Sequence, residues 1–209
     1  MRTLLLTTLA ATLVCAADKP EKGFVSLFNG KDLTGWTLAK ENEGTFTVHD
    51  GAIVAKGNRC HIYYTGPVNN HDFKNFELKV DVMTLANSNG GIYFHTAYQE
   101  TGWPVKGFEV QVNNTHKDWR KTGGLYAVAD NKDAVAQDGK WFTEHIVVKD
   151  KHVTIYVDGK KTSEWDQPAD WQAPKDMPGR AIGSGTIALQ GHDPGSTVHY
   201  RNIRIKALK

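Results

Sequence analysis

The sequence predicts an all-β protein, an antiparallel β-sandwich of the concanavalin-like jelly-roll type. Three observations predict it. Apolar and polar residues alternate along several short segments, Asp-Gly pairs separate neighbouring segments, and no helical period is sustained after the first 17 residues. Strict alternation indicates a strand with one buried face and one wet face. A chain of 209 residues with 20 glycines suits one such sandwich, because all-β domains of about 200 residues are commonly single.

The first 17 residues are expected to form a secretory signal peptide. Arg2 supplies the positive start, residues 4–14 form an apolar run too short to span a bilayer, and Ala16-Ala17 are small residues suited to cleavage. We therefore expect a single domain over residues 18–209, secreted or periplasmic. Lipidation at Cys15 is the less favoured alternative, because Val14 precedes it where a small residue would be needed. No other segment has the length and apolarity to cross a membrane.

Two hairpins are predicted at Asp-Gly pairs. Residues 45–48 and 52–55 flank the first pair, Asp50-Gly51, and residues 153–157 and 160–162 flank the second, Asp158-Gly159. Asp-Gly tolerates the positive φ of a two-residue turn. Between the hairpins, residues 76–82 and 108–112 alternate apolar and polar residues without fault, so each is predicted to be a strand at the sandwich surface.

A long loop is predicted over residues 163–180. It contains three prolines, together with Trp165 and Trp171. Because buried tryptophans would anchor such a loop, we expect it to pack down as a lid or flap.

The composition excludes several function classes. The net charge is only +2, from 25 basic and 23 acidic residues, so neither nucleic acid nor an anionic membrane is the expected partner. There is no phosphate-binding loop, no Gly-x-Ser-x-Gly and no His-Glu-x-x-His, and no nucleotide or organic cofactor is expected. Cleavage of the signal would leave Cys60 without a disulfide partner, so we expect a small buried hydrophobe there. The sequence carries no signal of an oligomeric state.

The outward phase of the predicted strands is chemically unusual. In a sandwich the apolar phase fills the space between the sheets, and the other phase faces out. Here that phase carries imidazoles, carboxylates and carboxamides, which bind hydroxyl groups, hold metals and move protons. The outward set is Asp81, Tyr93, His95, Glu109, Gln111, His145, Gln190 and His192, with Tyr126 beside it.

We assign candidate roles within this set. Glu109, His145 and His192 are the candidate catalytic groups. Glu109 lies between two aliphatic residues, and His192 lies in a Gly-rich strand-end loop. The candidate substrate-binding residues are Asp81, Tyr93, His95, Gln111, Tyr126, Gln190 and Arg201. A single outward histidine is most often a plain surface residue, and Arg201 could equally form a structural pair with Asp81 or Glu109. Together His95, Glu109, His145 and His192 could hold a divalent metal ion, although their spacing does not show it.

Three stretches of the chain resemble a known family. They are residues 23–36 (GFVSLFNGKDLTGW), residues 107–112 (GFEVQV), and residues 187–192 (IALQGH) running on to 200–206 (YRNIRIK). In their order and spacing they are similar to the secreted bacterial 3-keto-disaccharide hydrolases, also named 3-keto-glucoside lyases and hydratases. The resemblance covers nearly all of the chain after the signal, and it implies the same jelly-roll fold.

The resemblance also implies a chemistry. A glucosyl ring with a ketone at carbon 3 has an acidic proton at carbon 2. A base removes that proton, the group on carbon 1 leaves, and water can add to the resulting 3-keto-2-hydroxy-glucal. The paired carboxylates of ordinary glycosidases are then not obligatory. We expect Glu109, His145 or His192 as the base, a metal ion or Arg201 at the enolate, and another histidine as the acid.

Two competing functions are non-catalytic. A carbohydrate-binding sandwich would use the six tryptophans as stacking platforms for a sugar, and it would need no cluster of imidazoles and carboxylates. A structural or adhesion domain of the cell envelope predicts that the outward histidines do not converge.

Overall fold

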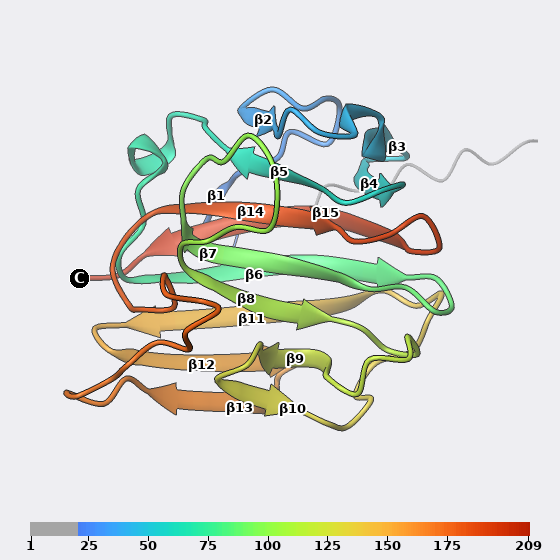
Figure 1. The fold of residues 1–209 in the computed structure, drawn as a ribbon. Helices are drawn as coiled ribbons and strands as arrows, with labels where there is room; N and C mark the ends of the chain where they lie inside the picture. The colour runs from blue at the N-terminus through green and yellow to red at the C-terminus, as the bar shows by residue number, and fades with distance from the viewer. Residues whose placement is uncertain (1–20) are drawn as a thin grey trace, which may run out of the picture.

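Two antiparallel sheets packed face to face make up the protein (Figure 1). The structure, a computed structural model, describes residues 21–209. The only helical segments in this range are two short 3-10 turns, Glu43–Thr45 and Val68–His71. No described helix is long and apolar enough to span a membrane. The predicted signal peptide over residues 1–17 lies outside the described residues.

One sheet, here sheet A, has the strand order β13-β12-β11-β6-β15-β4-β3, with β1 beside β15. Because β6 lies between β11 and β15, strands distant in sequence are neighbours, as in a jelly roll. The bounds are β1 Val25–Ser26, β3 Phe46–His49, β4 Ala52–Lys56, β6 Phe76–Thr84, β11 Phe142–Lys149, β12 His152–Val157, β13 Lys160–Asp166 and β15 Thr197–Ala207.

The other sheet, sheet B, has the order β10-β9-β8-β7-β14-β5-β2. Its bounds are β2 Trp36–Leu38, β5 Cys60–Tyr64, β7 Gly90–Thr96, β8 Phe108–Val112, β9 Lys121–Leu125, β10 Ala129–Asn131 and β14 Thr186–Gly191.

Both predicted hairpins are confirmed. The turn between β3 and β4 has φ of 48° at Asp50 and 74° at Gly51, and the turn between β12 and β13 has 47° at Asp158 and 78° at Gly159. Two successive positive φ values identify type I′ turns, whose twist matches that of the flanking strands. The local sequence therefore determines both connections.

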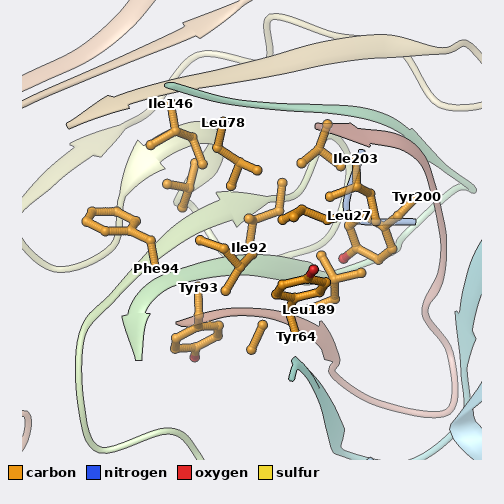
Figure 2. Packing of buried hydrophobic residues seen from close by; sticks show 14 of the residues in the cluster. Leu27, Tyr64, Leu78, Ile92, Tyr93, Phe94, Ile146, Leu189, Tyr200 and Ile203 are labelled. Carbon is orange, nitrogen blue, oxygen red and sulfur yellow. The ribbon is translucent and has the colours of Figure 1, made fainter. Parts of the chain in front are cut away.

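The core lies between the sheets. Leu78 and Ile146 from sheet A meet Ile92 and Leu189 from sheet B, and all four side chains are 0% exposed. Figure 2 shows the first three pointing toward one another, with the ring of Tyr93 pointing away from them. Burial of each such aliphatic side chain stabilises the fold by roughly 1.5–3 kcal/mol. Along these strands the apolar residues of the sequence pattern thus face the core, and the polar residues between them face the outer surface of one sheet or the other.

One carboxyl group lies in the core phase. Glu144 follows Phe142 and precedes Ile146 on the inward side of β11, is 0% exposed, and no side chain donates a hydrogen bond to its carboxyl group. Burial raises its pKa well above 4.5, because the charged form would be poorly solvated there. Burial therefore favours the protonated form of Glu144 in the folded protein.

The loop predicted over residues 163–180 packs down, as expected, although its first residues extend β13 to Asp166. Residues 167–185, here called the flap, connect β13 to β14. The ring of Trp165 lies 4.9 Å from that of Trp171, whose Nε1 donates a hydrogen bond to the carbonyl oxygen of Arg180 at 2.6 Å. These contacts fix the part of the flap that carries Arg180.

The flap also meets residues 97–107, the connection between β7 and β8, here called the Trp103 loop. Gly179 bridges to Lys106, and its carbonyl oxygen accepts a hydrogen bond from the Gly107 N–H at 3.0 Å. A Cβ atom on Gly179 would lie 1.9 Å from the Val105 carbonyl oxygen. This close approach requires glycine, so the flap and the Trp103 loop are held together at one backbone contact.

Candidate active site

A cavity of about 260 Å³ opens on the outer face of sheet B. Its floor comes from β7, β8 and β14, and its walls come from the Trp103 loop and the flap. The strand register places Tyr93 opposite Glu109, and it places Gln190 and Gln111 on either side of Gly91. Because these residues are in the outward phase of adjacent strands, their side chains share the cavity floor.

Glu109 is the central polar group of the floor. It is 5% exposed, it accepts a hydrogen bond from the Tyr93 hydroxyl at 2.8 Å, and it accepts a second from Gln190 Nε2 at 3.0 Å. A Cβ on Gly91 would lie 2.5 Å from Glu109 Oε1, so the absence of a side chain there makes room for the carboxylate. Two neutral donors orient the group without neutralising it.

The charge that faces Glu109 comes from the flap. Arg180 is 6% exposed, and its Nη2 lies 3.9 Å from Glu109 Oε2. Burial raises the pKa of Glu109, while the Arg180 guanidinium is the largest influence that lowers it. Arg180 Nη1 has no protein partner, so this cation has a donor left for a ligand.

His192 stands on the cavity wall. Its Nδ1 lies 2.8 Å from Asp193 Oδ2, and its ring centroid is 5.3 Å from that of Trp103. Asp193 in turn accepts hydrogen bonds from Ser196 Oγ and the Gly195 N–H. A carboxylate at Nδ1 favours the tautomer that protonates this nitrogen, which leaves Nε2 to exchange a proton.

The structure brings together six of the side chains that the sequence nominated. One cavity is lined by Tyr93, Glu109, Gln111, Tyr126, Gln190 and His192. The outward histidines themselves do not converge, as the envelope-domain hypothesis predicts, since His192 alone among them lines the cavity.

Three nominated residues are on the wrong sheet. Asp81, His145 and Arg201 lie on β6, β11 and β15 of sheet A, so they face away from the cavity on the opposite side of the molecule. Each has a structural neighbour there. His145 Nε2 lies 3.1 Å from Glu77 Oε2, Asp81 accepts a hydrogen bond from Asn202 Nδ2 at 2.7 Å, and Arg201 stacks on Trp141 at 3.8 Å. Alternation identifies an outward side chain, but it does not identify the sheet.

His95 is on the correct sheet but is not outward. Its φ of 53° interrupts the alternation at the end of β7. The ring is 1% exposed, and it packs 5.8 Å from Phe76 and 5.2 Å from Phe94. The outward position predicted for His95 is therefore wrong, because the backbone turns its side chain inward.

The four candidate metal ligands, His95, Glu109, His145 and His192, do not come together in the structure. Only Glu109 and His192 line the cavity. Over residues 21–209, no three His, Cys, Asp or Glu side chains gather closely enough to hold a metal ion. The residues present do not fit a protein-held divalent ion at this site.

Neither Arg180 nor His61 was predicted from the sequence as a site residue. Arg180 ends the predicted lid, but nothing in the sequence distinguishes it from other loop arginines. His61 is 0% exposed on β5, and neither ring nitrogen has a partner. The segment of β5 shows no strict alternation, so no pattern nominated it. Cys60 beside it is buried and free, as predicted, and burial raises its pKa to about 11.

Comparisons with known proteins agree with this architecture. The sequence model of a family described as 3-keto-alpha-glucoside-1,2-lyase-like domain matches residues 23–206. A 3-keto-disaccharide hydrolase of Bacteroides thetaiotaomicron is 26% identical over 235 residues, covering 89% of this chain and 79% of that protein.

Solved structures confirm the fold. A candidate glycosyl hydrolase of Parabacteroides distasonis is 27% identical, with a TM-score of 0.76, and the match covers 90% of this chain and 94% of that one. The carbohydrate-binding module CBM66 of Bacillus subtilis is 14% identical, with a TM-score of 0.60 over 83% of this chain and 96% of that one. The second similarity shows the fold alone, and both agree with the predicted concanavalin-like jelly roll.

Proposed function

Because this chain belongs to the 3-keto-alpha-glucoside-1,2-lyase-like family, a family of carbohydrate-active, hydrolase-like domains, we propose that it cleaves the glycosidic bond of 3-keto-glucosides by elimination. One observation carries the proposal. A single buried carboxylate, Glu109, is oriented by two neutral donors and faced by a guanidinium at the floor of a small cavity.

Glu109 is the base in this proposal. Its carboxylate removes the proton from carbon 2 of the sugar, which the neighbouring ketone has made acidic. Burial raises the pKa of Glu109, and a base whose pKa approaches the working pH accepts a proton more readily. The hydrogen bonds from Tyr93 and Gln190 hold the carboxylate in place while it does so.

Arg180 stabilises the enolate. The electron pair of the broken C–H bond moves toward the ketone, so negative charge develops on the carbon 3 oxygen. A preorganised cation in a cavity shielded from water stabilises such charge strongly. Arg180 replaces the Arg201 of the sequence-based hypothesis, because it is the guanidinium that lies beside Glu109.

His192 completes the reaction as the acid. As the bond from carbon 1 to the leaving oxygen breaks, that oxygen takes a proton from the imidazolium and leaves as an alcohol. The ring product is 3-keto-2-hydroxy-glucal, and addition of water across its new double bond gives 3-keto-glucose. Asp193 at Nδ1 orients the ring and favours the tautomer that leaves Nε2 as the atom that exchanges the proton.

A sugar-binding module without catalysis is the alternative. The exposed Trp103 on the cavity rim, 43% accessible, would serve such a module as a stacking platform. The buried carboxylate and its facing guanidinium have no evident use in it, because amides and aromatic rings suffice to bind sugar hydroxyls.

The test is a product assay. The protein is incubated with a methyl 3-keto-glucoside and with the unoxidised methyl glucoside, with and without a chelator, and products are followed by mass spectrometry. We expect loss of methanol from the keto substrate only, in the presence of chelator as well. Saturable binding of both sugars without cleavage would replace the proposal with the binding-module function.

A further inference from the structure

The cavity around Glu109 holds about one sugar ring. At about 260 Å³ it falls below the roughly 300–1,000 Å³ of cavities that enclose drug-sized ligands. A disaccharide therefore needs room beyond it for the leaving sugar. The question is which neighbouring surface could recognise a second ring.

Four unpartnered polar atoms lie beside the cavity on the same face of sheet B. They belong to three side chains: both ring nitrogens of His61, the hydroxyl of Tyr63, and Oε1 of Gln190. His61 is the register partner of Gln190, and Tyr63 is the partner of the next outward position of β14, Ala188. Buried polar atoms without partners are rare and costly in native proteins. Their grouping here indicates a surface built to meet polar atoms that are not its own.

Gln190 connects this surface to the cavity. Its Nε2 donates to Glu109 at 3.0 Å, while its Oε1 has no partner. One carboxamide therefore has a hydrogen-bonding group in the catalytic floor and another left for a neighbouring ligand. A ring bound beyond Gln190 would be directly continuous with a ring above Glu109.

A single layer of aromatic side chains covers the surface. The ring of Trp103 lies 5.6 Å from His61, and the ring of Tyr98 lies 5.4 Å from Tyr63. Both belong to the Trp103 loop, and they are 43% and 40% exposed on their other side. Figure 1 shows this loop, between β7 and β8, passing over β5.

Few polar contacts hold the cover in place. The Gly102 N–H donates to Glu41 Oε1 at 2.9 Å, the Lys40 N–H donates to the Glu100 carbonyl oxygen at 2.7 Å, and the Tyr98 hydroxyl donates to the Leu38 carbonyl oxygen at 3.4 Å. At the surface the side chains of Lys40 and Glu100 form an ion pair, and the Arg59 guanidinium lies 5.3 Å from the centre of the Trp103 ring. Segments with few buried contacts open at low free-energy cost. Displacement of residues 98–104, with the contact between Gly179 and residues 105–107 kept, would expose His61 and Tyr63 while leaving β5 and β14 intact.

We propose that the Trp103 loop covers a second sugar subsite, floored by His61, Tyr63 and Gln190, which takes the leaving-group sugar of a 3-keto-disaccharide. The proposal rests on the proposed function for the identity of the first ring. The floor suits a sugar because a neutral imidazole offers one donor and one acceptor, as does each ring hydroxyl. Burial, with the charges of Arg59 and His192, lowers the pKa of His61 to about 3, so this imidazole is neutral. Trp103 and Tyr98 supply apolar faces against which the ring can stack.

The kinetic test compares two substrates that share the oxidised ring. The kcat/KM for a 3-keto-disaccharide is divided by that for methyl 3-keto-glucoside, in the wild type and in His61→Phe. We expect this ratio to fall about tenfold in His61→Phe, since the aromatic packing is kept and both nitrogens are lost. His199→Phe, on the outer face of sheet A, is the matched control and leaves the ratio unchanged. An unchanged ratio in His61→Phe, or equal losses for both substrates, overturns the subsite.

A second variant and a second measurement test the subsite independently of His61→Phe. If His61→Phe does not fold, Tyr63→Phe removes one hydroxyl and should lower the ratio about threefold. Amide hydrogen exchange in residues 97–107 should accelerate when the disaccharide binds and should not accelerate when the methyl glucoside binds. Equal exchange rates with the two ligands would overturn the proposal that the Trp103 loop covers the subsite.

Failure of the proposed function gives a different result from failure of the subsite. If the wild type cleaves neither keto substrate, the elimination chemistry is wrong. The subsite is then tested by calorimetric Kd values for the unoxidised disaccharide and methyl glucoside. A preference for the disaccharide that His61→Phe abolishes supports the subsite, and the absence of any preference overturns it.

Discussion

The outer faces of the two sheets look alike in sequence and differ in the folded protein. Both carry carboxylates and histidines in the outward phase: Glu109 and His192 on the side of sheet B, Glu77 and His145 on sheet A. On sheet B, the Trp103 loop and the flap cover the face, and Glu109 is 5% exposed. On sheet A the side chains of Glu77 and His145 are 21% and 23% exposed, and the Glu77 carboxylate contacts Lys206 Nζ at 2.7 Å and His145 Nε2 at 3.1 Å.

This coverage reverses the direction of the pKa shift. Burial raises the pKa of Glu109, whereas the hydrogen bond from Lys206 lowers the pKa of Glu77. Burial also lowers the pKa of His145, although its contact with Glu77 opposes the change. Two glutamates in the same strand phase thus become a base with a raised pKa and a surface ion-pair partner. Their surroundings, not their place in the pattern, set their chemistry.

The largest expected effect comes from replacing the covered carboxylate. Glu109→Gln should lower kcat for a 3-keto-glucoside about 10³-fold, since a general base typically contributes 10²–10⁴-fold. Binding of the unoxidised glucoside should remain, because glutamine can still accept from Tyr93. Glu77→Gln on sheet A is the control and should leave kcat within about twofold. Comparable losses in both variants would remove the functional distinction between the faces.

The second effect concerns the two arginines that the sequence could not separate. Arg180→Met should lower kcat about 10²-fold, since it removes the cation from the developing enolate. Arg201→Met should leave kcat unchanged, and should cost about 0.5–1 kcal/mol of unfolding free energy through loss of its stacking on Trp141. Steady-state kinetics and denaturant unfolding of the two variants measure both quantities. A larger kinetic loss in Arg201→Met would put the site on sheet A.

The third effect tests whether coverage itself matters. Gly179→Ala places a Cβ 1.9 Å from the Val105 carbonyl oxygen, so the flap and Arg180 must shift, and we expect kcat to fall about tenfold. Gly183→Ala in the same flap has no atom within 4 Å of the added Cβ, and its kcat should match that of the wild type. Equal activity of all three proteins would show that the flap contact does not position Arg180.

The smallest expected effect concerns the pH dependence of stability and a third glutamate, Glu144, which lies in the core. The raised pKa of Glu144 means that the folded protein keeps a proton which the unfolded chain loses above pH 4.5, so stability falls as pH rises from there. Glu144→Gln removes this dependence, so its unfolding free energy relative to wild type should rise between pH 5 and pH 7, by at most about 1.4 kcal/mol per pH unit.

Glu77→Gln is expected to show the opposite dependence. The lowered pKa of Glu77 stabilises the fold above pH 4.5, and that contribution is lost as pH falls through the folded-state pKa. Urea unfolding at several pH values measures both slopes, and equal slopes in the two variants would show that burial does not set the pKa of Glu144.

Much of the fold was predictable from local pattern. The Asp50-Gly51 and Asp158-Gly159 turns formed where the sequence placed them, because positive φ at two successive residues is a local requirement that Asp-Gly satisfies. The outward position of Tyr93 and Glu109 followed from the period of two along a strand. The same period predicted an outward side chain for His95, and this prediction was wrong, because the backbone of His95 leaves the extended region near the end of β7.

The candidate site was predictable only in part. Glu109 and Gln190 were nominated correctly because each lies in a segment whose apolar phase is evident. Asp81 and His145 met the same criterion and lie on the far side of the molecule. Arg180 met no criterion, since it acts through the place where the flap is held against the Trp103 loop.

By itself the sequence determined the strand segments, the tight turns and the inward or outward phase of most side chains, because these depend on residues within a few positions of one another. The tertiary structure alone decided which strands became neighbours, which outer face was covered, and therefore which carboxylate was buried away from solvent. Those outcomes depend on contacts between residues far apart in the chain, such as β6 with β15 and Gly179 with Val105. No local pattern encodes such contacts, since each arises from the packing of the whole sandwich.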